Sequence, residues 1–427
     1  MKQTLFWIER EWFTTWILWG WLAIGVAFVL WNLKQADFKK KLVDFLPFFA
    51  IMTAVIYFVL PALSVLRVNP NDPLGDFVSG GLAVRGYGLF MMLAIVISIG
   101  LVIVRCRLEA ADPEPFITLC FVMIVCGLVG ARVFYVVQKW PDFVSPDPLQ
   151  TLVTVVDMTK GGLVVYGSLI GGLIGAAVFL RMKKLPILAT FDKLAPAMML
   201  GLAIGRIGCL MNGCCYGGIC GEDFPLGLRF PASSAPYHEQ YSKGLLFGLT
   251  GEWRESEKFP LKILGVAPGS IGEQFGLQPG DEVNLPTVIE PERLQFLLEN
   301  NVDLTLKAVV ETSQNGSIVR DVSLSKFPKR SMKIHPAQVY ASVSAFLICG
   351  LLWFCYPLRR FDGQVISSLL MTYAVSRFIE EAIRVDEQGV FGTPLSISQW
   401  ISIFTLLGGA TVYAVGQNRP SAKRPGS

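Results

Sequence analysis

The sequence predicts an all-α polytopic membrane protein with about nine transmembrane helices and one small β-rich insert. The first observation is composition, because 52% of the residues are hydrophobic and only 16% are charged, whereas soluble domains carry about 25% charged residues. The second is that runs of about 20 apolar residues, enough to cross a hydrocarbon core of about 30 Å, recur along the chain. The third is the stretch 257–327, where turn residues separate short runs of mixed polarity.

Nine segments have the length and composition of transmembrane helices, and six of them contain no Asp, Glu, Lys or Arg. The first is long, rich in tryptophan and followed by no small-residue cleavage site, so we interpret it as a span and not as a removed signal peptide. The fourth, sixth and eighth segments contain charged residues. The nine segments are 12–31, 45–66, 86–104, 116–138, 162–180, 193–211, 337–356, 364–384 and 396–416.

Lysine and arginine concentrate in every second loop between these segments. The loops after spans one, three, five and seven are basic, as is the C-terminal tail, and the other short loops carry few basic residues. Because basic loops stay in the cytoplasm, we expect the N-terminus outside, the C-terminus in the cytoplasm and the long segment 212–336 outside. The formal net charge of +4 is small for 427 residues and indicates no nucleic-acid partner.

The insert contains a stretch, Lys262 to Val283, that resembles the middle of a PDZ domain, with Gly-Leu-Gln-Pro-Gly-Asp closing a tight turn. Residues 291–300 predict an amphipathic helix, and the runs around Asn315–Gly316 predict a hairpin. PDZ domains capture peptide ends by adding a strand at a sheet edge, so an envelope protein is one expected partner. The Gly-rich loop that binds the peptide carboxylate has no convincing match, so a docking or spacer module is the alternative.

A first group of polar residues lies in the Gly-rich stretch Ala203 to Gly218, at the outer end of the sixth span. Arg206 falls about two turns inside the apolar run, and Asn212 follows in the Gly-rich part. An arginine near a helix end can extend its head group to the membrane interface. Irregular, Gly-rich backbone at membrane depth, however, is tolerated only inside the protein or beside a cavity, which favours a binding site.

A second group lies on the eighth span, where Tyr373, Arg377, Glu381 and Arg384 are spaced i, i+4, i+8 and i+11. We expect these four residues on one helix face, with Glu381 one turn from both arginines. Ionisable groups inside the membrane are functional hypotheses by default, and two guanidinium groups match the oxygens of a lipid phosphate. An ion-pair ladder without catalytic duty is the alternative.

A third group comprises Tyr87, Tyr135 and Tyr166, which supply hydroxyl groups, and Arg132, which supplies another buried cation. Each is weak evidence alone, because tyrosines at the membrane interface are ordinary. Four cysteines, Cys209, Cys214, Cys215 and Cys220, cluster nearby without the paired spacing of a zinc site. A disulfide, for instance Cys215 to Cys220, and simple packing of thiols are the competing interpretations, and we expect no metal and no cofactor.

Together, these segments resemble the bacterial prolipoprotein diacylglyceryl transferase family. The residues that carry the resemblance begin with Arg85-Gly86-Tyr87-Gly88-Leu89, and the later motifs follow in the family's order. These later motifs are residues 130–136, 161–172, 192–213, 225–231, 335–342, 363–384 and 395–400. The expected domains are 1–81 (two additional N-terminal transmembrane helices), 82–248 (first part of the membrane core), 249–332 (PDZ-like periplasmic insert), 333–416 (second part of the core) and 417–427 (basic cytoplasmic tail).

The resemblance implies a multi-pass enzyme of the bacterial inner membrane that uses no metal or cofactor. Its substrates would be phosphatidylglycerol and prolipoprotein signal peptides with a lipobox cysteine, and its reaction would transfer the diacylglyceryl group to the cysteine thiol. It implies catalytic roles for four residues and lipid or substrate binding for five. The first set is Arg377, Tyr166, Glu381 and Asn212, and the second is Arg206, Tyr87, Arg132, Tyr373 and Arg384.

The chain departs from the family pattern at four positions. Tyr166 stands where many members have His, Cys209 where Asn is usual, Cys214 where an acidic residue is usual, and Ala341 where Glu is usual. These departures keep open a second hypothesis, a non-catalytic membrane scaffold that binds envelope proteins through its PDZ-like insert. A transporter is a third, although the motif pattern contains no inverted repeat.

Overall fold

The computed structural model divides the chain into two compact units. The first comprises Met1–Phe90, Ile207–Val339 and Ile383–Asp386, and the second comprises Met91–Arg206, Tyr340–Ala382 and Glu387–Ser427. The residues that the structure describes are 4–8, 16, 18–32, 49, 53, 66–68, 72, 78–79, 82–144, 146–156, 162, 164–255, 258–284, 290–302, 304–312, 316–384, 389–390 and 392–418.

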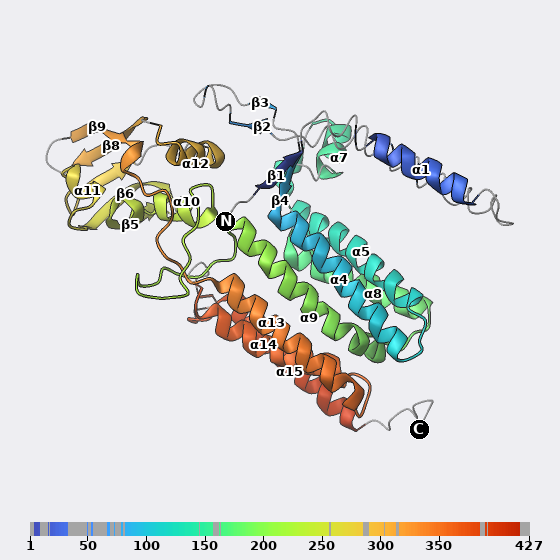
Figure 1. Cartoon of the computed structure of the whole chain (residues 1–427). Coiled ribbons are helices and arrows are strands. Elements are labelled where there is room, and N and C mark those ends of the chain that lie inside the picture. Colours follow the sequence, from blue (N-terminus) through green and yellow to red (C-terminus); the bar gives the residue numbers. More distant parts are fainter. Residues whose placement is uncertain are drawn as a thin grey trace. The chain divides into compact units, whose positions relative to one another are not determined.

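Long helices form at seven of the nine predicted spans (Figure 1). Among the described residues, six of them are long and apolar enough to cross a membrane. The seventh, α14, is more polar because it contains Arg377, Glu380 and Glu381. The helices are α4 (Gly86–Leu108), α5 (Glu114–Gln138), α8 (Val165–Met182), α9 (Ile187–Asn212), α13 (Ala337–Cys355), α14 (Gln364–Glu381) and α15 (Ile397–Gln417).

The two remaining predicted spans precede α4. The first coincides with a shorter apolar helix, α1 (Leu18–Asn32), and the second, 45–66, lies almost entirely outside the described residues. The total of nine spans therefore stays a prediction. Short strands also occur here: β1 (Thr4–Ile8) pairs antiparallel with β4 (Leu82–Arg85), and β2 (Leu66–Arg67) pairs with β3 (Val78–Ser79).

Helices α5 and α8 approach each other closely through glycines. A Cβ atom on Gly130 would overlap the carbonyl oxygen of Gly167, and one on Gly171 would overlap the carbonyl oxygen of Cys126. In a membrane, where lipid removes most of the hydrophobic drive for association, small residues allow the close backbone packing that holds helices together. Gly167 and Gly171 are thus packing residues of this helix pair.

Two buried clusters hold the helices of the second unit together. One joins α9 to α13 and α14, and it includes Ala203, Leu352 and Leu369. The other joins α4, α5, α8 and α9, and it includes Leu119 and Leu180, both with no exposed surface. Because α9 contributes to both clusters, it is the central helix of this unit.

The start of α14 is held by a buried carboxylate on α9. Asp192 has no exposed surface, and its two oxygens accept hydrogen bonds from the backbone N–H groups of Gly363 (2.7 Å) and Ile366 (2.8 Å). The first N–H groups of a helix have no partner within the helix, and a negative charge there is favoured by the helix dipole. Asp192 therefore anchors the N-terminus of the helix that carries Arg377 and Glu381.

The first unit contains a five-stranded antiparallel sheet in which every strand pairs with its neighbour in sequence. The predicted amphipathic helix is present as α12 (Pro291–Glu299), and a short helix, α11 (Ile271–Gln274), precedes it. The predicted hairpin strands also pair, whereas the likeness to a PDZ domain stays a prediction. The strands are β5 (Leu249–Glu255), β6 (Lys258–Val266), β7 (Glu282–Asn284), β8 (Thr305–Thr312) and β9 (Gly316–Ser323).

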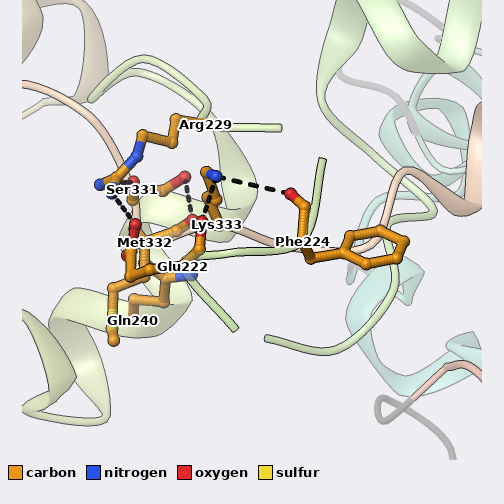
Figure 2. Close-up of polar contacts among 7 residues, drawn as sticks. All are labelled: Glu222, Phe224, Arg229, Gln240, Ser331, Met332 and Lys333. Carbon is orange, nitrogen blue, oxygen red and sulfur yellow. Dashed lines mark hydrogen bonds and ion pairs between the residues drawn. The ribbon is translucent and has the colours of Figure 1, made fainter. Parts of the chain in front are cut away.

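The hydrophobic core of this sheet extends beyond the predicted insert, because it also includes residues that precede position 249, where the insert was expected to begin. Leu261 and Leu297 pack in one cluster with Tyr237 and Tyr241 of α10 (Ala235–Ser242) and with Phe247. The segment that leads from β9 to α13 is tied to the loop before α10 (Figure 2).

Polar contacts make this connection between the two chain segments. Arg229 pairs with Glu222 and donates to the carbonyl oxygen of Ser331 at 3.5 Å, and the Met332 N–H group donates to Gln240 Oε1 at 2.7 Å (Figure 2). The Arg229–Glu222 pair lies within the loop. The other two contacts join residues that are about 90 or more positions distant in the sequence. The segment that follows the sheet is thereby fastened to this loop and to α10.

The glycine contact of α5 and α8 generates a stability prediction. The variant Gly171→Leu should lower the melting temperature, because the new side chain forces the two backbones apart and overpacking costs about 1–3 kcal/mol. The measurement is a thermal ramp on the detergent-purified protein, with the remaining folded fraction read by size-exclusion chromatography. Gly408→Leu on α15 is the matched control, since no atom beyond its own stretch of helix lies within 4 Å of the position of its Cβ. Equal melting temperatures for both variants would contradict the packing role.

Candidate functional site

An ion pair on α14 forms the centre of the candidate site. Arg377 Nη2 lies 2.7 Å from Glu381 Oε2, one helical turn further along. The Glu381 side chain is 3% exposed and that of Arg377 16%. The predicted pairing of these two residues is confirmed, and it follows from the i, i+4 spacing that places them on one face of the helix.

Two serines at the start of α15 complete this arrangement. Ser396 is the N-cap of α15 and its Oγ donates a hydrogen bond to Glu381 Oε1 at 3.3 Å. Arg377 Nη2 also donates to Ser398 Oγ at 3.2 Å. Within the described part of the chain, both of these guanidinium contacts use Nη2, which leaves Nε and Nη1 as donors that a bound anion can meet.

The burial of this pair has an energetic consequence. Removing one partner of a buried ion pair leaves an uncompensated charge and costs about 3–5 kcal/mol.

A second carboxylate on the same helix, Glu380, is held separately by the hydroxyl groups of Ser344 (2.7 Å) and Ser376 (2.9 Å). The sequence analysis did not identify any of the serines that contact Arg377, Glu380 or Glu381. For Ser396 a signal was present, because Ser396 and Gln399 form a capping box with the spacing Ser-x-x-Gln.

Tyr373 and Arg384 flank the ion pair in sequence and take different positions. Tyr373 is half-buried against the cluster that joins α9, α13 and α14. The expectation that Arg384 continues the same helix face is wrong, because α14 ends at Glu381. The chain leaves the helix there, and the carbonyl oxygen of Ile383 accepts the N–H group of Gly218 at 3.1 Å. A hydrogen bond to a distant segment thus replaces the next helical turn.

The end of α9 brings Tyr87 and three of the clustered cysteines together. A Cβ atom on Gly208 would lie 3.3 Å from the carbonyl oxygen of Tyr87 and 3.5 Å from its ring, so the glycine allows α4 to pack here. Asn212 is the last residue of the helix and is half-buried. Arg206 lies earlier on α9 and is also half-buried.

The sulfur atoms of Cys209, Cys214 and Cys215 all lie within 4.8 Å of one another. None of the nine cysteines, all of which the structure describes, forms a disulfide, so the bond between Cys215 and Cys220 considered from the sequence is absent from the structure. The sequence placed these cysteines near one another along the chain, and the turn after α9 brings three of the sulfur atoms together. Cys215 adopts a left-handed backbone conformation, with φ of 58°.

Arg132 fastens three backbone carbonyl groups. Its Nε donates to Val155 (2.8 Å), its Nη2 to Thr154 (2.8 Å) and its Nη1 to Gly162 (3.2 Å). The guanidinium also lies 5.2 Å from the ring centre of Phe143, in the short helix α6 (Trp140–Phe143). Arg132 therefore ties α5 to the end of α7 (Pro148–Val156), and a role in substrate binding stays a prediction.

Tyr166 and an apolar cavity complete the inventory of the second unit. Tyr166 lies in the first turn of α8, and 44% of it is exposed. The cavity, of about 280 Å³, lies between α4, α5 and α9 and is open on one side. Its lining is almost entirely apolar and includes Met91, Ile95, Met123 and Met198. A cavity with this lining is suited to hydrocarbon.

Known proteins resemble this chain over most of its length. The model of the family described as prolipoprotein diacylglyceryl transferase matches residues 76–415. A protein of Rhodopirellula baltica named phosphatidylglycerol--prolipoprotein diacylglyceryl transferase is 34% identical over 440 residues, which cover 95% of this chain and 87% of that protein. A Clostridium tetani protein of the same name is 23% identical over 341 residues, covering 79% of this chain and 96% of that protein.

The match to the R. baltica protein extends beyond the residues of the family model, because it includes almost all of this chain. The family model itself covers more than half of the chain, in the region whose motifs predicted the resemblance. The polytopic character expected from composition agrees with the six candidate spans. This chain belongs to the prolipoprotein diacylglyceryl transferase family.

Proposed function

We propose that this protein transfers the diacylglyceryl group of phosphatidylglycerol to the thiol of the lipobox cysteine in prolipoproteins. Family membership and the names of the relatives support the reaction. The observation that carries the site is the buried Arg377–Glu381 pair, held by Ser396 and Ser398. It presents a fixed guanidinium group within a mostly apolar helix bundle, where a lipid phosphate needs a cation.

The chemistry assigned to this site is displacement at carbon. The cysteine thiolate attacks the CH₂ carbon of the diacylglyceryl group, the bond from that carbon to the phosphate oxygen breaks, and glycerol phosphate leaves with the electron pair. Arg377 stabilises the charge that develops on the leaving phosphate through Nε and Nη1. Preorganised donors in a water-poor site are worth more than the same donors in water.

The remaining residues take supporting roles in this proposal. Arg206 contacts the lipid phosphate, and Tyr87, Arg132, Tyr373 and Arg384 bind substrate. Asn212 orients the reacting groups. The apolar cavity beside Met91 and Met123 takes an acyl chain of the lipid, because its lining offers hydrocarbon and almost no polar atoms.

Deprotonation of the substrate thiol is assigned to Tyr166, whereas Glu381 acts by holding Arg377 in place through their ion pair. A free cysteine has a pKa of about 8.5, so a base or a nearby cation raises the fraction of reactive thiolate. Tyr166 stands where many family members have His, and its exposed position at the start of α8 allows a substrate to reach it. No metal or cofactor is needed for the displacement itself.

Location and orientation follow the charge pattern. We place the protein in the bacterial inner membrane with its N-terminus outside and its C-terminus in the cytoplasm, since the basic loops alternate. The insert 249–332 is then periplasmic, between the core parts 82–248 and 333–416. Strands β5 and β9 are the two ends of its sheet order, and an edge strand can pair with an added peptide, which supports an envelope protein as its partner.

The Arg377 assignment generates the first functional prediction. Arg377→Ala should lower lipidation of a lipobox peptide by about 10²–10³-fold or more, because one preorganised donor contributes that much. The lipidation activity of Arg377→Lys, which keeps the charge but loses the planar fork, should lie between that of Arg377→Ala and that of the unmodified protein. The assay uses purified protein, phosphatidylglycerol and the peptide, with product read by mass spectrometry.

Arg181→Ala is the matched control for this experiment, because Arg181 is an exposed residue in the last turn of α8. Its activity should equal that of the unmodified protein. Full activity of Arg377→Ala in protein that elutes normally from size-exclusion chromatography would overturn the site assignment.

Arg206→Ala generates a second functional prediction. It should abolish lipidation at low phosphatidylglycerol concentration, because the lipid phosphate loses a cationic contact. A titration with phosphatidylglycerol in detergent micelles measures the change in apparent KM. An unchanged KM together with an unchanged kcat would contradict lipid binding by Arg206.

The role proposed for Tyr166 generates a third functional prediction. Tyr166→Phe should reduce kcat by about 10²-fold, the lower end of general acid–base effects, with little change in the KM for phosphatidylglycerol. Tyr166→His, which places the residue usual in the family, should retain or raise activity at neutral pH. If Tyr166→Phe is fully active, the hydroxyl group takes no part in proton transfer.

A further inference from the structure

The turn that follows α9 gathers three thiols that the proposed reaction does not use. Cys209 lies in the last turn of the helix, and Cys214 and Cys215 follow it after the left-handed residue Gly213. Their three sulfur atoms lie within 4.8 Å of one another. Cys220, the fourth cysteine of the sequence cluster, does not belong to this group.

The backbone holds the three thiols in place. The N–H groups of Gly213 and Cys214 both donate to the carbonyl oxygen of Cys209, at 2.9 Å and 3.2 Å. Gln338 Nε2 donates to the carbonyl oxygen of Cys214 at 2.7 Å. Hydrogen bonds therefore close the turn and anchor it to the segment that begins α13.

Cys215 adds a second sign of a constrained arrangement. Its φ of 58° lies in the left-handed region, which a residue with a Cβ atom rarely adopts. Such conformations persist where the surrounding structure imposes them, and they occur often at ligand sites. Here the left-handed turn accompanies the return of the Cys215 thiol to those of Cys209 and Cys214.

Three converging thiols match a soft divalent cation. Zn²⁺ binds thiolate sulfur at about 2.3 Å in a tetrahedral arrangement, which places the sulfur atoms about 3.8 Å apart. The observed separations of up to 4.8 Å need only a small contraction to reach that value. A disulfide would use two of the three thiols and leave the third without a purpose, whereas a metal ion uses all three.

We propose that Cys209, Cys214 and Cys215 form a three-thiolate binding site for one Zn²⁺ ion, with a fourth coordination position open. On binding, the three thiols lose their protons to solvent and the three sulfur atoms share the cation. No fourth protein ligand of the His, Cys, Asp or Glu type joins the group among the described residues. The open position is the arrangement of zinc sites that take an exchangeable ligand.

Metal content of the full-length protein tests the proposal independently of lipidation activity. The detergent-purified protein, reduced with a phosphine, is incubated with ZnCl₂, passed through a desalting column and analysed by inductively coupled plasma mass spectrometry. About one Zn²⁺ per chain is expected. Cys209→Ser, Cys214→Ser and Cys215→Ser should each lose most of it, and Cys220→Ser is the matched control that should retain it.

A second measurement uses the unmodified protein and so does not depend on the folding of variants. Maleimide labelling with and without ZnCl₂, read by peptide mass spectrometry, should show protection of Cys209, Cys214 and Cys215 by the ion. Loading with Co²⁺ should add the intense thiolate-to-cobalt absorption of a sulfur-rich site. Each of these results supports the site.

Three outcomes would overturn it. Unchanged zinc content in all three serine variants would place the ion elsewhere. Equal labelling of the three thiols with and without zinc would show that they are not ligands. A disulfide between two of them, found in protein isolated from membranes without reductant and resistant to the phosphine, would assign the cluster to covalent cross-linking.

Discussion

The buried carboxylate of Glu381 constrains the arrangement of the candidate site. A charge buried this deeply in an apolar helix bundle must be paired, and here Arg377 and Ser396 satisfy it together. This requirement aligns the end of α14 with the beginning of α15. Asp192 imposes the same kind of constraint at the other end of α14, where it accepts two backbone N–H groups. Two buried carboxylates thus position the helix that carries Arg377.

Small residues set the second level of organisation. In lipid, helices gain little from burying apolar side chains against one another, so close backbone contact becomes the source of stability. The glycines of α5 and α8 supply that contact, and Arg132 then satisfies carbonyl groups at the end of the neighbouring short helix α7. Arg132, for which we propose substrate binding, thus also has a structural role in the fold. The contacts of Arg377 with Glu381 and Ser398, by contrast, both use Nη2.

The departures from the family pattern gain a physical interpretation from the turn after α9. Cys209 and Cys214 occupy positions where the resemblance leads one to expect an amide and a carboxylate, both of which are oxygen-bearing groups. In this chain the same positions, with Cys215, place three sulfur atoms together. Replacement of oxygen by sulfur in one small region changes the cations it suits, from hard ions to soft ones.

The sequence by itself determined the positions of the long helices from α4 onward, because apolar length is a local property that the membrane thickness dictates. It also determined the Arg377–Glu381 pair, since residues four apart on a helix are neighbours in any fold. Only the tertiary structure decided that α14 ends before Arg384, that Ser396 and Ser398 complete the ion pair, and that Cys209 joins Cys214 and Cys215. Each of these three features depends on a contact between segments or on the path of a turn. The periodicity of a single helix encodes no contact between segments and no path of a turn.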